Sequence, residues 1–414
     1  MSFSKWKIFY QSLLALMLVS GYAYAAGGRQ DDTLQNIMSR LDRLEQNGGM
    51  GGFTSYDGTS NSDGEQSHRA NVHAFDAMHF DFGGYLHTGM TYIRSDLGDF
   101  EHLSFNIQEV DLIMKAMLRE DLMFFAALSF SYNSALDMED PDSPFFREFC
   151  WNSCVDVAWA NYTYADWLQV QWGRFATPMG IINIEHFQPM LMEALKPMFL
   201  RPHGGETIFP THLTGLNVHG KVYMGDNDSM MIEYNAFTGT YDAGPINILA
   251  GARVAWSMME IGLTVGGNFF HGKRAGGTFC GEETYNYTWQ DIFSDEINDY
   301  NLVGIDVLWD WDHFIWKNEF FYSWEDDMAN DIFAFYTQPA YRLNDNWLFF
   351  YRYDVLRTNP VNSNWRGSEH ILGVNWLPYP NVRVRGEWVF SSTKNTSAIH
   401  QDNDIGVITG VFSF

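Results

Sequence analysis

The sequence predicts an all-β protein, a sixteen-stranded antiparallel transmembrane β-barrel with an inward-folded third loop, preceded by a short coiled-coil helix. Three observations predict it. From about residue 78 to the end, apolar and polar residues alternate with a period of two; very short turns alternate with longer loops; and the chain stops on Phe414 inside an alternating strand. Successive side chains of a strand point to opposite faces. One face of such a strand can therefore meet lipid and the other water.

The amino-acid composition agrees with a transmembrane β-barrel. Of the 414 residues, 46% are apolar, 17% aromatic and only 18% charged, with 36 Gly and 12 Pro, a composition too apolar for a disordered chain. The formal net charge is −26. Nucleic-acid partners are excluded, because their binding depends on Lys and Arg that neutralise phosphates.

The first element, residues 1–25, is predicted to be a cleaved signal peptide. Lys5 and Lys7 precede an apolar run from Ile8 to Val19, and Ala23-Tyr24-Ala25 offers an Ala-x-Ala cleavage site. An uncleaved membrane anchor is the alternative. The run is shorter than the roughly 20 residues that a spanning helix needs.

The second element, residues 26–47, is predicted to be a periplasmic coiled-coil segment. Leu34, Ile37, Leu41 and Leu44 follow a/d spacing between polar residues. Two heptads alone are marginal, so a lone surface helix is the alternative. Residues 48–77 are rich in Gly, Ser and Asp and are predicted to form a flexible linker.

Residues 78–414 are predicted to form the barrel. Each predicted strand has about the 9 to 11 residues that a tilted membrane-spanning strand needs, or slightly more. Short turns such as 119–121 and 165–167 alternate with longer loops such as 134–153 and 271–298, as in outer-membrane barrels. An even strand count lets the last strand pair with the first. The predicted strands begin near residues 78, 103, 121, 154, 166, 212, 229, 249, 258, 299, 312, 331, 346, 368, 381 and 404.

The alternation assigns each strand a lipid face and a lumen face. The lipid face takes residues such as Val384, Trp388 and Phe320, whereas the lumen face takes charged and polar ones. A soluble β-sandwich is the alternative. The predicted inward residues are Lys115, Lys221, Arg253, Lys317, Arg352, Arg383, Arg385, Asn217, His219, Asp81, Glu109, Asp111, Asp156, Glu233, Glu260, Asp306, Glu319, Asp354 and Glu387.

The loop at about 175–211 is predicted to narrow the lumen, because its many Met and Phe residues would be costly to expose to water. Charged groups on both sides of the predicted constriction could set a field that orients solutes. The alternative is that these charges only pair with one another and are structural. The predicted pore-lining and constriction residues are Arg253, Lys317, Arg352, Arg383 and Arg385 on the wall and Glu185, Glu193 and Glu206 on the loop.

Three cysteines follow the leader. The spacing makes Cys150 and Cys154 the expected disulfide in an oxidising compartment, which leaves Cys280 without an assigned partner. The acidic stretch Asp137–Asp142 lacks the ligand spacing of a dedicated calcium site. We find no G-x-S-x-G, H-E-x-x-H or P-loop motif, so we expect no enzyme, no cofactor and no dedicated metal site.

The stretch GRFATPMG, with Gly173, Arg174, Phe175, Pro178 and Gly180, resembles the motif that precedes the inward-folded third loop in the phosphate-selective porin O/P superfamily. The helical prelude resembles that of related trimeric porins, and the terminal Phe414 is similar to the assembly signal of outer-membrane barrels. The resemblance implies a homotrimer assembled by the barrel assembly machinery. The predicted lumen is mixed and slightly acidic, so phosphate selectivity is not carried over.

The sequence thus predicts an outer-membrane porin of a Gram-negative bacterium that lets small polar or charged solutes diffuse through a water-filled channel. Its surroundings would be outer-membrane lipids and lipopolysaccharide. One alternative is a plugged outer-membrane barrel that acts as a surface-binding protein or enzyme. Another is a soluble exported β protein that binds carbohydrate. The solute, the sign of ion selectivity and any gating are left open.

Overall fold

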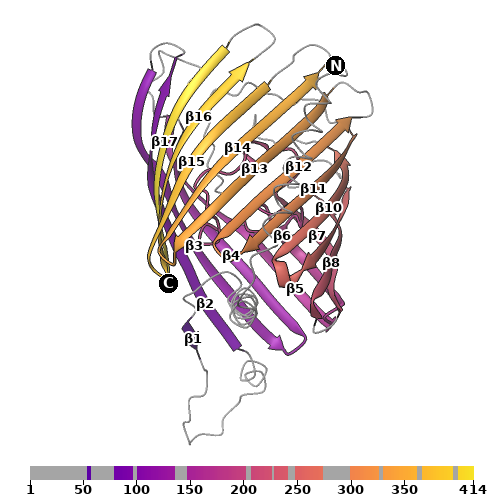
Figure 1. Ribbon diagram of the computed structural model, residues 1–414. Helices are drawn as coiled ribbons and strands as arrows, with labels where there is room; N and C mark the ends of the chain where they lie inside the picture. Colours follow the sequence, from indigo (N-terminus) through magenta and orange to yellow (C-terminus); the bar gives the residue numbers. More distant parts are fainter. Residues whose placement is uncertain are drawn as a thin grey trace, which may run out of the picture. The chain divides into compact units, whose positions relative to one another are not determined.

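The computed structural model (Figure 1) describes residues 54–56, 79–96, 100–135, 147–201, 207–225, 228–240, 248–273, 299–325, 330–360, 366–394 and 400–414. The chain divides into two units, residues 1–44 and 45–414, and all described residues lie in the second. The predicted signal peptide and coiled coil lie outside the described residues. So does the predicted linker, apart from the three-residue strand β1 (Thr54–Tyr56), which pairs with β2.

The second unit is a closed barrel of sixteen antiparallel strands, as the sequence predicts. Hydrogen bonding runs from each strand to the next, and β17 pairs with β2, so none of the sixteen has a free edge. The strands are β2 (His79–Ser95), β3 (Phe100–Arg119), β4 (Leu122–Ala135), β5 (Arg147–Ala165), β6 (Leu168–Ala176), β7 (His212–Met224), β8 (Met230–Thr240), β9 (Ile248–Met258), β10 (Leu263–Lys273), β11 (Asp299–Trp311), β12 (Phe314–Glu325), β13 (Asn330–Asn344), β14 (Trp347–Pro360), β15 (Arg366–Tyr379), β16 (Val382–Lys394) and β17 (His400–Ser413).

The chain end closes the barrel. Phe414 exchanges two backbone hydrogen bonds with Gly84 of β2, each 3.0 Å long. The Phe414 ring lies 3.0 Å from where a side chain at Gly84 would begin. The terminal residue therefore extends the pairing of β17 with β2, so the alternating apolar strand has a neighbour on both sides.

Strand connections follow the predicted alternation. β3 joins β4 through residues 120–121 and β5 joins β6 through 166–167, whereas β6 and β7 are separated by residues 177–211. Every predicted strand start falls within seven residues of an observed one. The largest differences are at β5, which begins at Arg147, and at β10, which the short 3-10 turn η4 (Met259–Ile261) delays to Leu263.

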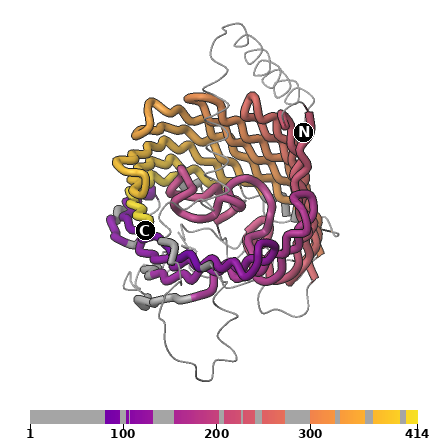
Figure 2. The backbone as a smooth tube through the Cα atoms, turned by 90° about the horizontal axis from the view of Figure 1, so that it is seen from below, coloured from indigo at the N-terminus to yellow at the C-terminus, as the bar shows by residue number. Residues whose placement is uncertain are grey.

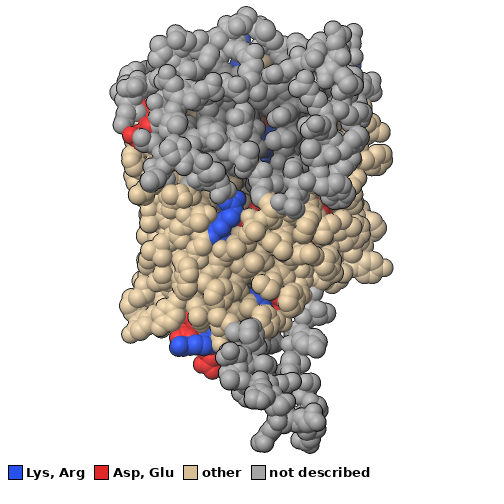
Figure 3. Space-filling view, turned by 180° about the vertical axis from the view of Figure 1, so that it is seen from behind, with Lys and Arg blue, Asp and Glu red and all other residues tan. Residues whose placement is uncertain are grey.

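The two faces of the wall differ as expected from alternation. Outward residues such as Ile305 and Leu372 are 56% and 55% exposed, whereas inward neighbours such as Asp306 and Ile371 are fully buried. The described wall in Figure 3 is mostly uncharged, with charged side chains near its edges. Glu260 corrects one prediction, since it lies exposed in the turn η4 and not on the inner wall. Among the described residues, no helix is long and apolar enough to cross a membrane.

Candidate functional site

The segment between β6 and β7, residues 177–211, lies within the ring of strands (Figure 2). We call it the enclosed segment; it is described at 177–201 and 207–211. Prolines at 178, 189, 197 and 210 interrupt regular structure, and the described part holds only one 3-10 turn, η2 (Met198–Leu200). It is therefore irregular backbone inside a barrel.

The motif GRFATPMG starts this segment. Gly173 and Gly180 have positive φ angles of 122° and 69°, where side chains are disfavoured. A Cβ on Gly180 would lie 2.1 Å from an oxygen of Glu319. Phe175 and Pro178 are buried. The motif thus turns the chain from the wall into the barrel, while the Arg174 Nε donates to the backbone oxygen of Asp156 at 2.8 Å.

Apolar side chains of the enclosed segment pack against three parts of the inner wall. Phe199 and Phe209 lie among Phe270, Phe321 and other residues of β8 to β14. Leu195 packs against residues of β2, β3 and β12 to β17, and Phe187 against residues of β2 to β5 and β17. The segment therefore reaches the wall in several directions.

Carboxylates on β12, β14 and β16 accept the segment's backbone N–H groups. We call β12 to β16, which lie across the barrel from the ends of the segment at β6 and β7, the far wall. The N–H of Ile182 donates to Glu319 at 3.0 Å, that of Leu195 to Glu387 at 3.2 Å and that of Met198 to Asp354 at 2.8 Å. Ala194 also donates to Glu387. Because buried backbone groups need partners, these side chains replace the pairing that a strand would supply.

Basic side chains of the same wall donate to the segment's carbonyl oxygens. Arg352 donates to the carbonyl of Leu195 at 2.8 Å, and Arg385 to that of Glu193 at 2.7 Å. Arg383 donates to the carbonyl of Leu191. Farther along the segment, the Arg201 guanidinium pairs with Glu369 of β15.

These contacts correct the predicted lining of an open lumen. Lys317, Arg352 and Arg385 are only 3%, 0% and 0% exposed, so the segment covers them. Arg352, Arg383 and Arg385 hold its backbone, and Lys317 pairs with Glu185. On this side of the wall the basic residues therefore hold the segment in place, which agrees with the alternative that these charges are structural.

The remaining predicted constriction residues have different partners. Arg253 does not meet the segment's glutamates; it pairs with Asp306 at 2.7 Å and with Glu233 at 3.7 Å. Glu193 accepts from Gln338 at 3.0 Å. Glu206 lies outside the described residues. Arg253 thus lies apart from the loop glutamates, whereas Glu185 pairs with Lys317 and the charges of Lys317 and Arg352 act on Glu193. Loop and wall charges therefore do face one another among the described residues, and a field that orients solutes stays a prediction.

Glu193 is ionised in spite of its burial. Removal from water favours the neutral acid, but the charges of Lys317 and then Arg352, together with the Gln338 hydrogen bond, hold the pKa of this carboxyl below its ordinary value. A charged Glu193 therefore helps to fix the segment against the wall.

The expected disulfide is wrong. Cys150 and Cys154 lie in the single strand β5, opposite Asn133 and Ser129. At about 3.3 Å per residue, four residues along a strand separate their Cα atoms by roughly 13 Å, beyond the 7 Å limit for a bridge. Cys154 is disulfide-bonded. Cys280, the third cysteine, and the acidic stretch 137–142 lie outside the described residues.

The sequence pattern did not predict a cluster at β5 to β7, which we call the near wall, where His186 of the segment meets Asp156 and His212. Fifty-six residues of sequence separate its first and last members. Alternation correctly placed Asp156 on the inner face, but it carries no information about which loop residues approach that face. Only the proximity of a strand end to an inward loop could have pointed to it.

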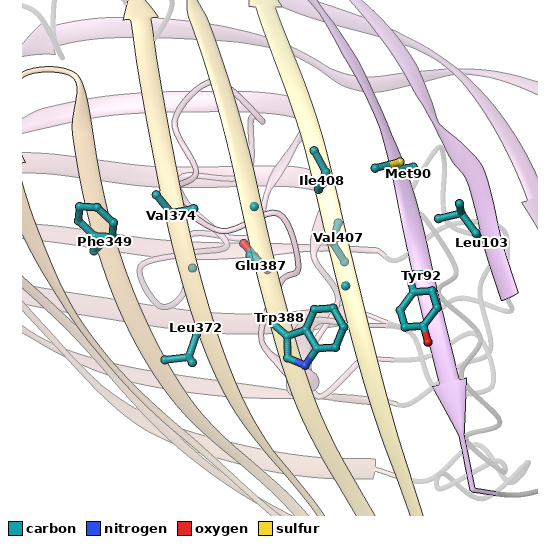
Figure 4. Close-up of a pocket in the computed structure, with 13 residues that line it drawn as sticks. Met90, Tyr92, Leu103, Phe349, Leu372, Val374, Glu387, Trp388, Val407 and Ile408 are labelled. Atoms are coloured by element: carbon teal, nitrogen blue, oxygen red, sulfur yellow. The ribbon is translucent and has the colours of Figure 1, made fainter. Parts of the chain in front are cut away.

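The outer wall carries an apolar hollow over β2, β3 and β14 to β17 (Figure 4). Met90, Tyr92, Leu372, Trp388 and Ile408 line it. Glycines at 386 and 406 deepen it, because no side chain projects from them. The hollow lies on the opposite side of the wall from the carboxylate and arginine contacts.

No protein-family model matches this chain, and no curated protein matches its sequence. Solved structures do match. OmpT of Vibrio cholerae is 13% identical with a TM-score of 0.54, over 82% of this chain and 98% of that one. An anion-selective porin from Comamonas acidovorans is 11% identical with a TM-score of 0.54 (81% and 100%), and OmpF of Salmonella typhi in complex with daunomycin is 12% identical with a TM-score of 0.50 (81% and 98%). These likenesses show a porin-like barrel fold.

Proposed function

We propose that this protein is an outer-membrane porin through which small polar or charged solutes diffuse passively, with the enclosed segment as the constriction. One observation carries the proposal: a segment anchored at both ends to neighbouring strands crosses to the opposite wall and is held there by buried charged side chains. A segment held by so many buried contacts keeps one position, as a permanent narrowing of the channel requires. The fold that it shares with porins supports the same proposal.

The wider setting is proposed on the same grounds. The chain would be exported by a cleaved signal peptide, assembled in the outer membrane of a Gram-negative bacterium among lipids and lipopolysaccharide, and perform no catalysis. Membership of the phosphate-selective porin O/P superfamily rests on the motif around Gly173 and Gly180. A homotrimer, with the N-terminal coiled coil contributing, would use the outer hollow lined by Tyr92 and Trp388 as a contact face. A solved form of the similar OmpT is a trimer.

Planar-bilayer recording tests the proposal. The purified, detergent-extracted protein should give conductance steps in groups of three, and the reversal potential under a salt gradient gives the sign of selectivity. A matched variant replaces residues 177–211 by a short turn, which the geometry allows because Ala176 and His212 already pair across β6 and β7. Its conductance should be larger than that of the parent protein. Equal conductance would contradict a constricting role for the segment.

A plugged barrel is the second candidate, and a specific observation favours it. The enclosed segment packs apolar side chains against three parts of the wall, more than a narrowing on one side requires. A folded, heat-modifiable barrel without conductance, which gains conductance when 177–211 is replaced, would establish the plug. The protein would then act at the surface as a binding protein.

A further inference from the structure

Three potential metal ligands converge where the enclosed segment leaves the near wall. His212 Nε2 lies 3.3 Å from one carboxylate oxygen of Asp156, and His186 Nε2 lies 3.6 Å from the other. One ligand atom from each of the three residues can be chosen so that all lie within 4.8 Å of one another. The side chains of Asp156, His186 and His212 are 13%, 10% and 7% exposed. They come from β5, the enclosed segment and the first residue of β7.

The backbone aims Asp156 at this point. Ala127 of β4 pairs with Val157 and Leu128 with Val155, so Asp156 is an extra residue in β5, a β-bulge. Bulges redirect a side chain and are common beside functional sites. Arg174 stabilises the bulge by donating to the backbone oxygen of Asp156.

The two histidines are positioned differently. His212 Nδ1 lies 3.2 Å from the Thr211 hydroxyl, which fixes the ring and directs Nε2 toward Asp156, as outer partners of metal ligands commonly do. The His186 ring packs on Phe187 and meets the His212 ring edge-on. Both nitrogens of His186 are buried; Nδ1 has no hydrogen-bond partner, and Nε2 has only the 3.6 Å contact with Asp156, which is longer than a hydrogen bond.

We propose that Asp156, His186 and His212 bind one divalent transition-metal ion, with Zn²⁺ as the best match. Zinc bonds of about 2.0 to 2.2 Å in a tetrahedron place neighbouring ligand atoms about 3.4 Å apart. His212 Nε2 lies 3.3 Å from Oδ1 of Asp156, close to that spacing, and one ligand atom from each residue can be chosen with all three within 4.8 Å of one another. Imidazole suits zinc and related metals, whereas calcium and magnesium take oxygen ligands. Water fills the fourth position.

The ion would join the enclosed segment to two strands of the near wall. The far wall holds residues 182–198 through hydrogen bonds and ion pairs, and the metal would fix the segment at residue 186 on the opposite side. The proposal goes beyond passive diffusion, because it gives the segment a metal-dependent anchor. Lys196 is another charged group that acts on Asp156, and its charge opposes that of the ion.

Metal binding is measured on the full chain, folded in detergent and treated with a chelator, by titration with Zn²⁺ against a chromogenic zinc indicator. One ion per chain is expected. The same titration with Co²⁺ reports geometry, because tetrahedral Co²⁺ absorbs visible light far more strongly than octahedral Co²⁺. Neither measurement uses conductance, so failure of this proposal and failure of the porin proposal are distinguishable.

Single-residue variants test which side chains bind the metal ion. His186→Gln and His212→Gln should each abolish stoichiometric binding, whereas His219→Gln, on β7 and hydrogen-bonded to Asn161, should leave it unchanged. Thr211→Val, which keeps all three ligands, should weaken binding about 10–100-fold. Lys196→Met should strengthen it. Absence of stoichiometric binding by the parent chain, or binding equally retained in His186→Gln and His212→Gln, would overturn the proposal.

Discussion

Arginines on the inner face of the wall bind different partners in two regions of the barrel. Arg352 and Arg385, on β14 and β16, donate to backbone carbonyls of the enclosed segment. Arg253, on β9, donates to the carboxylate of Asp306 on β11. The difference teaches that alternation places a charge on the inner face, but what covers that face decides whether the charge supports a loop or balances another charge.

The cause is the irregular backbone of the enclosed segment. A strand in the same place would satisfy its N–H and C=O groups with a neighbouring strand, but residues 191–198 have none. Arginine brings five donors, and a carboxylate accepts several hydrogen bonds. Two arginines and a glutamate on the inner face of β16, at 383, 385 and 387, therefore supply donors and acceptors to one passing chain.

The largest effect is expected for Arg385→Met. It leaves the carbonyl of Glu193 without its donor and removes one of the two buried arginines whose charges act on the buried Glu387, Arg352 being the other. Breaking a buried charged network costs about 3–5 kcal/mol. The segment should loosen, so single-channel conductance should rise and the midpoint of denaturant unfolding in detergent should fall.

Arg253→Met is the matched control for that variant. It should also reduce stability, because Asp306 stays buried, but it should leave the conductance close to that of the parent, since Arg253 does not bind the segment. If both variants changed conductance equally, the distinction between the two groups of arginines would fail.

A smaller effect is expected from acidification through Glu193. Because the pKa of this carboxyl in the folded protein lies below its ordinary value, ionisation stabilises the docked segment fully above the ordinary value of 4.5. This stabilisation is lost as pH falls through the lower, folded-state pKa. A charge-assisted hydrogen-bonded group of this kind contributes about 1.5–3 kcal/mol.

Limited proteolysis of the enclosed segment from about pH 7 to about pH 3, with an acid-stable protease, measures this loosening. The parent should become cleavable at the acidic end, and Glu193→Gln should be cleavable across the whole range. Glu233→Gln, whose carboxylate does not touch the segment, is the matched control. Parallel pH profiles for the parent and Glu193→Gln would show that another group governs the acid response.

Much of the barrel could be predicted because its physics is local. A strand with lipid on one face and protein or water on the other must alternate, and turns between antiparallel strands are read from their residues. The prediction missed the first residues of β5 and the turn η4, where alternation is interrupted.

The candidate site was less predictable because it depends on contacts between distant residues. Alternation correctly placed Lys317 and Arg385 on the inner face, yet it could not show that residues 177–211 would cover them. The bulge at Asp156 and its approach to His186 arise only once β4, β5 and the segment are assembled. Spacing likewise favoured Cys150 and Cys154, which one extended strand keeps apart.

The smallest change in stability is expected for Glu233→Gln, which tests the part of the wall that the segment leaves uncovered. Glu233 lies 3.7 Å from Arg253 and its side chain is 30% exposed, so solvent screens the pair and its loss should cost less than about 1 kcal/mol. A partly exposed inward carboxylate instead acts on passing ions. The reversal potential under a salt gradient should therefore shift toward anion preference with little change in unfolding midpoint, whereas Arg385→Met should change the midpoint most. A Glu233→Gln protein with an unaltered reversal potential would mean that the permeating ions do not pass this wall, and would place the open path along other strands.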